Sequence, residues 1–496
     1  MLRNSLLVAV ASLLAGQVSP LLAEVSFVNG ITIPGNTLDA TGLPGANQGR
    51  IGFFSDIYFD PQRKQWWGLS DRGPGGGVLS YETRVQRFKV DIDKKTGAIS
   101  KFRVQQTIKF TDPKGLLDDP LASGAALNGL NPGALNGDAA ILGRSFDPEG
   151  LVINPLNGHF VVADEYGPSV LEFNREGELL KQFETPENLK PRLRDAAGTP
   201  AALDYVAGRA TAGIYFGRQD NRGFEGIAIS PDGKMVYAVL QDPLINEPGA
   251  NNGRDGRNVR IVAFNSNPKS VNYGKSTAQY AYQLEPQADI AARILAQGGT
   301  ATSTDPRQGR NIGLSAIAAI NDHEFMVLER DNRGLGVDDP AGASVVGSKR
   351  VYKIDLSGAT DISHSILPGG DLSATGIVPV AKSPTLIDLA ANTLLPNGKI
   401  AEKWEGLAIG PELEGDARLI LTGNDNDYSV TQNASNVQFD VYVDFNGNSV
   451  QRDIDRPSQL NGIEVGPVPT GYTLIPGVLH AYKVSERDLG EFQSPE

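Results

Sequence analysis

Cysteine is absent from this chain of 496 residues. Its absence excludes disulfides, thiol nucleophiles and metal sites built from thiolates. Histidine is also scarce, because the chain has four in all, and these are scattered rather than grouped. The sequence therefore does not support a Ser-His-Asp triad or a histidine-rich zinc site.

Long apolar segments are absent beyond the N-terminus. There, Arg3 precedes an apolar run from Leu6 to Leu14, and small residues precede a cleavage point after Ala23. This pattern is typical of a secretory signal peptide over residues 1–23, with an uncleaved N-terminal anchor as the alternative. No later segment reaches the roughly 20 apolar residues of a spanning helix. We expect residues 24–496 to form one soluble, exported domain in the periplasm, outside the cell or in an equivalent lumen.

Positive charge is in deficit as well. The chain has 45 Lys and Arg against 58 Asp and Glu, and loss of residues 1–23 removes only Arg3, which leaves 44 against 58 and a formal charge of −14. An acidic surface repels nucleic acid and anionic lipid, so neither is an expected partner. The expected partner is a small molecule, and an anionic one would need a bound cation or a local group of arginines.

The chain does contain a repeated Glu-Gly motif. The segment "FDPEGLVI" at Phe146 returns as "RGFEGIAI" at Arg222 and as "EKWEGLAI" at Glu402. Two weaker copies are "FFSDIYFD", with Asp56 near the Glu position, and "NIGLSAIAAI", with Ser315 in its place. Each copy leads into a second apolar strand that ends in acidic or amide residues, and then into a third strand of alternating polarity. The repeat unit is therefore a small antiparallel sheet.

The sequence predicts an all-β fold, and specifically a β-propeller. A sheet of three or four strands cannot bury both faces alone, so repeated sheets pack radially as blades. The 57 Gly and 31 Pro suit many strands and turns. We favour six blades, with five as the alternative, because a sixth could lie in the long spacers at residues 113–143 and 186–217. The N-terminal strand "SFVNGITI" is available to complete the last blade, and the spacers are expected to lie over one rim.

The repeated acids predict a calcium site. Matched positions of successive blades converge at the central channel of a propeller, where carboxylates repel each other unless a cation lies between them. Oxygen ligands without thiolates select a hard cation, and Ca²⁺ accepts a larger and more flexible set of oxygens than Mg²⁺. The expected metal ligands are Asp71, Glu149, Glu225, Glu329, Glu405, Asn424 and Asp425. In the alternative interpretation, the Glu-Gly pair is a fold device in which Glu accepts backbone N–H groups and Gly allows close approach.

Arginine recurs beside these acids, in "SDRG", "DNRG" and "ERDNRG". A guanidinium group can clamp a phosphate with two parallel hydrogen bonds. The alternative is that the arginines pair with the acids of the ring. The candidate catalytic residues are Glu165, Arg72, Arg330 and Asp331, and the candidate substrate-binding residues are Arg222 and Arg333.

The set "LSDRGPGG", "DPEGL…ADEYG", "NRGFEGIA", "LERDNRG" and "KWEGLAI…GNDND" resembles the phytase-like family with esterase-like activity, over residues 29–483. The resemblance implies a β-propeller that hydrolyses phosphoesters or esters. The acids of the family pattern map onto Asp71, Glu149, Glu165, Glu225, Glu329, Glu405 and Asp425. The leading prediction is an exported, calcium-dependent, phytase-like or phosphodiesterase-like hydrolase. The alternatives are a calcium-dependent lactonase or carboxylic esterase, and a non-catalytic propeller that binds a ligand or protein.

Overall fold

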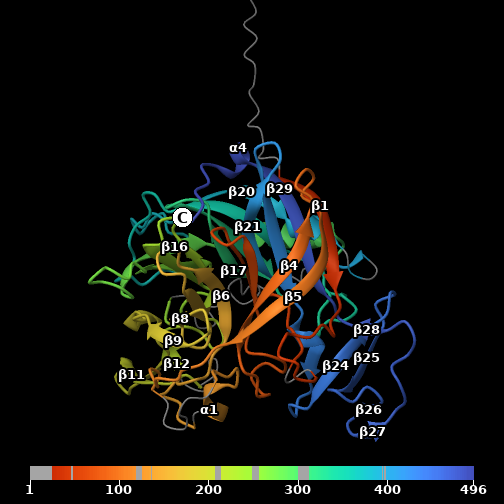
Figure 1. The fold of residues 1–496 in the computed structure, drawn as a ribbon. Coiled ribbons are helices and arrows are strands. Elements are labelled where there is room, and N and C mark those ends of the chain that lie inside the picture. The colour runs from red at the N-terminus through yellow and green to blue at the C-terminus, as the bar shows by residue number, and fades with distance from the viewer. Residues whose placement is uncertain are drawn as a thin grey trace, which may run out of the picture.

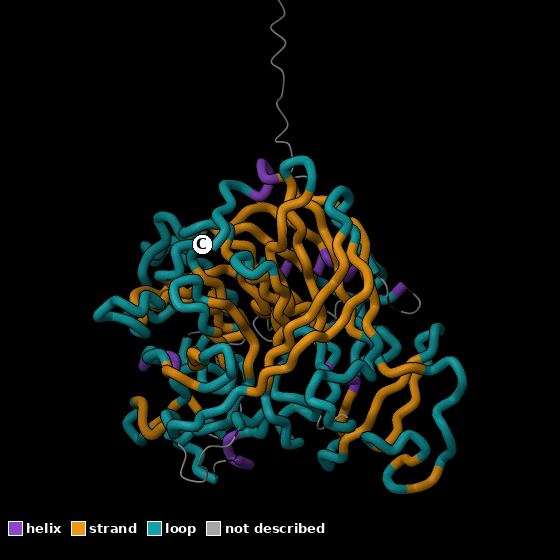
Figure 2. Tube along the Cα trace, viewed as in Figure 1, coloured by secondary structure: helices purple, strands orange, loops and turns teal. Residues whose placement is uncertain are grey.

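Strands dominate the molecule, and most of them belong to four-stranded antiparallel sheets (Figures 1 and 2). The computed structural model describes residues 25–45, 49–118, 126–135, 137–206, 214–247, 256–299, 312–393, 395 and 398–495. The expected signal peptide, residues 1–23, lies outside the described residues. Among the helices of the described part, none is long and apolar enough to cross a membrane.

Five sheets form the blades of the propeller within the described part of the chain. Blade 1 consists of β2 (Asp56–Asp60), β3 (Gln65–Leu69), β4 (Arg84–Ile92) and β5 (Ile99–Lys109). Blade 2 consists of β6 (Pro148–Ile153), β7 (Phe160–Asp164), β8 (Ser169–Phe173) and β9 (Leu179–Gln182). Blade 3 consists of β13 (Phe224–Ile229), β14 (Met235–Leu240), β15 (Asn258–Asn265) and β16 (Ser276–Gln283).

The last two blades complete the ring. Blade 4 consists of β17 (Ile312–Ala319), β18 (Glu324–Asp331), β19 (Lys349–Asp355) and β20 (Ala381–Asp388). Blade 5 consists of β21 (Lys403–Leu413), β22 (Ala417–Asp425), β29 (Gly477–Ser485) and β1 (Val25–Ile33). The N-terminal strand β1 pairs with β29, so it completes the last blade as expected. The inner strands contact each other in the order β2, β6, β13, β17, β21, and β21 returns to β2.

The ring of described blades has five members, which was the alternative to the favoured six. The two long spacers form other structures in their described parts. The first holds the short helix α1 (Pro132–Leu135), and the second holds η1 (Glu187–Leu189) and a small sheet of β10 (Arg192–Arg194), β11 (Pro200–Leu203) and β12 (Ile214–Phe216). In Figure 1, α1, β11 and β12 lie together at one rim.

A further sheet lies beside the propeller, at the same end as these spacers (Figure 1). It contains β23 (Val430–Gln432), β24 (Gln438–Val443), β25 (Ser449–Asp453) and β28 (Thr473–Leu474), and the hairpin of β26 (Gln459–Leu460) and β27 (Ile463–Glu464) follows β25. The buried ion pair between Arg50 and Asp440, at 2.6 Å, ties this sheet to the propeller. The remaining helices are α2 (Gln287–Ala296), η3 (Leu389–Ala391), η5 (Asp427–Ser429) and α4 (Glu486–Leu489).

The glycine of the Glu-Gly motif permits the inner strands to pack closely. A Cβ atom at Gly150 would lie 2.6 Å from the backbone N of Ile227, and one at Gly406 would lie 2.7 Å from Ile57. Both distances are too short for a side chain, so a larger residue would displace the backbone of the neighbouring strand at Gly150 and the side chain of Ile57 at Gly406. The motif thus has a structural role in its glycine, independent of what its glutamate does.

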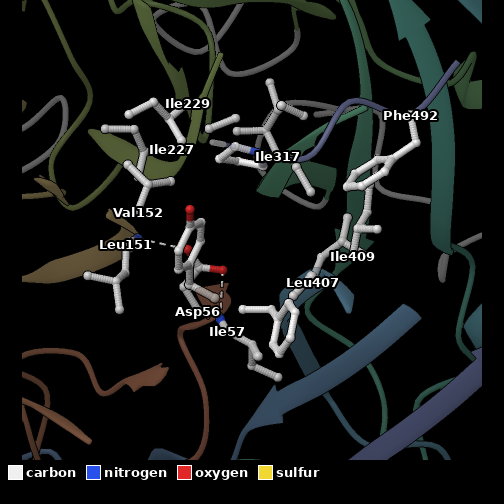
Figure 3. A pocket seen from close by; sticks show the side chains of 17 residues that line it. Asp56, Ile57, Leu151, Val152, Ile227, Ile229, Ile317, Leu407, Ile409 and Phe492 are labelled. Atoms are coloured by element: carbon white, nitrogen blue, oxygen red, sulfur yellow. Dashed lines mark hydrogen bonds between the residues drawn. The ribbon is translucent and has the colours of Figure 1, made fainter. Parts of the chain in front are cut away.

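The later residues of the five inner strands line an apolar part of the channel. Figure 3 shows Ile57, Leu151, Ile227, Ile317 and Leu407 around a cavity. The volume of this cavity is about 60 Å³. The C-terminal segment reaches this end of the channel, where Phe492 and Pro495 complete the lining. Aliphatic side chains from every blade therefore line this part of the channel.

Candidate functional site

The opposite end of the same inner strands carries a group of carboxylates that we call the acidic cluster. Its members lie close to the channel axis, and all except Asp427, which is half-buried, are buried. Their mutual electrostatic influence runs around the ring from blade 1 to blade 5 and back. The acidic cluster consists of Asp71, Asp147, Glu149, Glu165, Glu225, Asp242, Glu405, Asp425 and Asp427.

Strand register decides which side chains enter the cluster. In each of four blades, the residue before the motif's Glu position pairs with a residue near the end of the second strand. These pairs are Pro148 with Asp164, Phe224 with Leu240, Leu314 with Glu329 and Trp404 with Asn424. The next residues of the second strands are Glu165, Gln241, Arg330 and Asp425. Because successive side chains point to opposite sides of a strand, these next residues face the acidic cluster. Glu165 lies near Glu149, and Gln241 donates to Glu225. Arg330 reaches Glu225 and Glu405 of the two neighbouring blades, and the charge of Glu405 acts on Asp425.

Glu149 is the least compensated member of the cluster. Its side chain is buried, with 7 % of the residue exposed. Among the described residues, no group donates a hydrogen bond to its carboxylate and no cation pairs with it. Burial, and then the charges of Asp147, Glu225 and Glu405, hold the pKa of Glu149 well above its usual range. A buried carboxylate in this position is costly unless a cation joins it.

Two groups of three carboxylates have the spacing of a metal site. In one, oxygens of Asp71, Asp147 and Glu149 all lie within 4.8 Å of one another. In the other, the same limit holds for Glu149, Glu165 and Glu225. An ion with Ca–O distances of about 2.4 Å can contact three oxygens only if they lie within about 5 Å of each other. Both groups meet this condition, and they share Glu149.

Four cationic side chains reach the cluster, and each is already paired. Arg72 binds Asp147 through Nη1, at 2.9 Å, and through its backbone N–H. Arg222 lies 3.4 Å from Asp242 and 3.7 Å from Glu165.

The other two cationic side chains pair with carboxylates of blade 5. Arg330 donates to Glu405 and lies 3.4 Å from Glu225. Lys403 contacts Asp427 and lies 3.6 Å from Asp425. The nine carboxylates therefore outnumber the four cations of the cluster, and the site keeps a large negative charge when all the acids are ionised.

Burial raises several pKa values in the cluster. The pKa of Asp71 rises from 3.8 to about 6, mainly by burial, although Arg72 opposes the shift. Burial also holds the pKa values of Glu225 and Asp425 well above their usual range. Glu225 Oε2 is buried and has no hydrogen-bond partner among the described residues. These carboxylates fit a hard divalent cation, which would replace the missing donors with oxygen coordination.

Two of the expected metal ligands lie outside the acidic cluster. Glu329 points to the neighbouring blade, where its carboxylate accepts from Lys382 and from the backbone N–H of Glu285. Asn424 accepts from the backbone N–H of Val478 at 2.6 Å and is thereby committed to the sheet of blade 5. The physical reason is the strand register described above, because both residues precede the position that faces the cluster.

Other expected site residues have local structural contacts. Asp331 accepts from the backbone N–H of Gly347 at 2.6 Å and pairs with Lys349 at 3.0 Å. Arg333 donates to the backbone carbonyl of Val345 at 3.2 Å. Neither contacts a cluster carboxylate in the interactions of the described residues.

The weak motif copies also differ from expectation. Asp56 takes the place of the motif's glycine rather than its glutamate. Its carboxylate lies in the channel, where it accepts from the backbone N–H groups of Leu151 and Ile57, both at 2.8 Å (Figure 3). Ser315 donates to the backbone carbonyl of Trp404 at 2.8 Å.

Sequence reasoning missed Asp147 and Lys403 as site residues. Asp147 and Lys403 both stand two residues before a motif glutamate, so they occupy matched positions with opposite charge. The side-chain period of a strand would have placed both beside the glutamate on the same face.

The sequence pattern of the family described as "Phytase-like: Esterase-like activity of phytase" matches residues 49–428. The chain belongs to this phytase-like family. Family membership indicates a hydrolase with a small-molecule substrate. The matched residues include every member of the acidic cluster.

A secreted protein of Arthroderma benhamiae is a sequence relative of this phytase-like chain. The two are 27% identical over 426 residues, which are 74% of this chain and 79% of the relative, and the relative's description is "Uncharacterized secreted protein".

Solved structures similar to this phytase-like chain include Kuenenia stuttgartiensis hydrazine synthase, at 11% identity, TM-score 0.26 and 78% coverage of each chain. A putative 6-phosphogluconolactonase from Bacteroides uniformis has 10% identity and TM-score 0.28 over 90% of this chain and 99% of the other. The PQQ-bound aldose sugar dehydrogenase of Streptomyces coelicolor has 10% identity and TM-score 0.26 over 92% and 99%. These scores are too low to support an argument about function.

Proposed function

We propose that this phytase-like protein is an exported, calcium-dependent hydrolase of phosphoesters. The observation that carries the proposal is Glu149, a buried carboxylate without a donor or a cationic partner among the described residues. If Glu149 had only a structural role, its carboxylate would be expected to accept hydrogen bonds from backbone N–H groups, as the carboxylate of Asp56 does. A bound cation explains why an uncompensated charge stands at the channel axis.

The carboxylates of the cluster have two proposed roles, which are to hold calcium and to accept a proton. Asp71, Asp147, Glu149, Glu165 and Glu225 would hold the calcium, which when bound supplies positive charge to phosphate oxygens and lowers the pKa of a bound water. Glu165 is the cluster carboxylate that we assign as proton acceptor as well, through the carboxylate oxygen that does not hold the ion.

The three arginines of the cluster differ in how far they remain accessible to a substrate. Arg72 and Arg222 keep 18% and 16% of their side chains exposed, whereas Arg330 keeps 7%. Arg72 and Arg222 are therefore the better placed to meet an incoming anion, and each would share its guanidinium between a carboxylate and the substrate. Arg330 is a positioning residue that holds Glu225 and Glu405 together.

A substrate panel with and without calcium tests the proposal. The panel contains p-nitrophenyl phosphate, a phosphodiester, phytate, a carboxylic ester and several lactones. We expect hydrolysis of a phosphoester in calcium and its loss after chelation. Equal phosphoester hydrolysis in chelator, or no phosphoester hydrolysis under either condition, would contradict the proposal.

One observation favours a second candidate, a calcium-dependent carboxylic esterase or lactonase. Every cationic side chain of the cluster is paired with a carboxylate, so the cluster without a metal offers little attraction to an anion. A neutral ester would not meet this repulsion. Calcium-dependent hydrolysis of only the ester or lactone members of the same panel would identify this second function.

A further inference from the structure

The carboxylates and the cationic side chains of the acidic cluster are distributed unevenly around the ring, which bears on where metal ions can bind. Six of its nine carboxylates come from blades 1 to 3, where they are accompanied by Arg72 and Arg222. The other three come from blade 5 and are accompanied by Arg330 of blade 4 and Lys403 of blade 5. When all groups are ionised, blades 1 to 3 keep four negative charges and blades 4 and 5 keep one.

The spacing of the oxygens matches this division. Both carboxylate triads with metal-site spacing lie in blades 1 to 3, and Glu149 is the only residue that they share. In the described residues, no triad of that spacing includes Glu405, although it is a motif glutamate like Glu149. The difference between these two glutamates is Arg330, which contacts Glu405 and leaves Glu149 untouched.

We infer that the acidic cluster binds two divalent cations on the side of blades 1 to 3, with Glu149 bridging them, and that Arg330 and Lys403 replace a metal on the other side. One cation is held by Asp71, Asp147 and Glu149, and the other by Glu149, Glu165 and Glu225. Two divalent cations carry four positive charges, which balance the excess on this side. The inference rests on the proposed function only for the choice of calcium.

Unpartnered atoms support the second of the two positions independently of the count of acids. Glu225 Oε2 and Glu165 Oε1 are buried and accept no hydrogen bond within the described residues, and the guanidinium group of Arg222 lies 3.7 Å from Glu165 Oε1, beyond hydrogen-bond distance. Glu225 directs its other oxygen, Oε1, to Gln241 and Arg330. The free oxygens therefore belong to the same triad as Glu149, and a cation in this triad would satisfy them.

The experiment is calcium titration of the full mature protein by calorimetry after removal of bound metal, with atomic emission analysis of the loaded protein. We expect about two calcium ions per chain. Asp71→Asn and Glu225→Gln should each reduce this number to about one, and the remaining ion should differ between the two variants. Glu149→Gln should lower the affinity for both ions by the largest factor, at least about 10-fold for each.

Asp425→Asn is the matched control, because Asp425 is a buried cluster carboxylate of blade 5 that lies beside Lys403. It should leave the number of ions unchanged. Thermal unfolding in chelator shows that each variant is folded, and loss of a repelling carboxylate should raise the melting temperature of Glu149→Gln. A variant that is unfolded in chelator would contradict the assignment of its carboxylate as an uncompensated charge.

The outcomes separate this inference from the proposed function. One calcium ion per chain with calcium-dependent hydrolysis would overturn the inference and leave the function standing. Two ions without hydrolysis of any ester in the panel would overturn the function and leave the inference standing. Loss of the same single ion in Asp71→Asn and Glu225→Gln would also overturn the inference. The absence of any bound ion would overturn both.

Discussion

The two ends of the central channel are built from the same five strands and face opposite physical demands. At one end, Ile227, Leu151 and Leu407 are buried around an apolar cavity and need no partner outside the fold. At the other, Glu149 and Glu225 stand a few residues earlier on the same strands, without enough donors or cations. The comparison shows that the apolar end is stabilised by burial within the fold, whereas the carboxylates of the acidic end need a bound cation to balance their charge.

Glu149→Gln should have the largest effect on activity. We expect a loss of calcium-dependent hydrolysis of about 10²-fold or more, because the bridging carboxylate of the site is removed. The measurement is kcat/KM on the best substrate of the panel.

Glu172→Gln is the control for that variant. Glu172 is a buried glutamate of blade 2 outside the cluster, and it accepts from Asn157 at 2.8 Å and contacts His159 and Tyr273. Its loss should lower the melting temperature and leave the hydrolysis rate unchanged. An equal loss of activity in both variants would remove the distinction between acids of the cluster and other buried acids.

Ile227→Ala should weaken the apolar end without touching the acidic one. Ile227 is buried, with 1% exposure, so truncation should leave a cavity and lower the free energy of unfolding by about 2–5 kcal/mol. Chemical denaturation in chelator measures this effect, and calcium affinity should stay the same. A folded variant that has lost calcium binding would show that the two ends are not independent.

The fold could be predicted from the repeats because each Glu-Gly copy marks an inner strand and its hairpin partner. The number of blades could not be predicted, since residues 113–143 and 186–217 are long enough for another blade, whereas their described parts contain α1 and the sheet of β10, β11 and β12 instead. Their length indicated a possible blade, and only the course of the backbone shows otherwise.

The acidic cluster was predictable where the motif is intact, as at Glu149, Glu225 and Glu405. Errors arose at the ends of the second strands, where a shift of one residue moves a side chain to the other face. The side chains of Glu329 and Asn424 point away from the acidic cluster, whereas those of the next residues, Arg330 and Asp425, point towards it. The sequence carries no alternation signal strong enough to choose between adjacent polar residues.

Stability should depend on pH in the calcium-free protein because of Asp71. Burial raises the pKa of Asp71 from 3.8 to about 6, so between these values the native state binds more protons than the unfolded state. Stability should therefore fall as the pH rises through this window, by roughly 1–3 kcal/mol, and the raised pKa of Glu225 extends the trend upward.

Melting curves in chelator at pH values from 4 to 7 measure this dependence. Saturating calcium should remove most of it, since the metal competes with protons for the same carboxylates. Asp71→Asn should show a smaller slope in chelator than the wild type does. Stability that rises with pH over this window in the wild type would contradict the assignment.

Asp56→Ala should have the smallest effect of this series. Asp56 lies at the cavity of the apolar end and accepts hydrogen bonds from the backbone N–H groups of Leu151 and Ile57. Its loss leaves these donors without a partner, and we expect a cost of about 1–3 kcal/mol in denaturation experiments. Calcium binding should be unchanged. A larger change in calcium affinity than in stability would place Asp56 in the acidic cluster after all.

The most direct test of the account is the melting temperature of the purified mature protein after chelation and after addition of calcium, with bound metal measured in parallel. The account predicts bound calcium at neutral pH, a lower melting temperature in chelator and recovery with calcium. It also predicts a much smaller difference for Glu149→Gln. A wild-type protein that holds no divalent ion and melts at the same temperature in both conditions would contradict the central claim that the acidic cluster is a cation site.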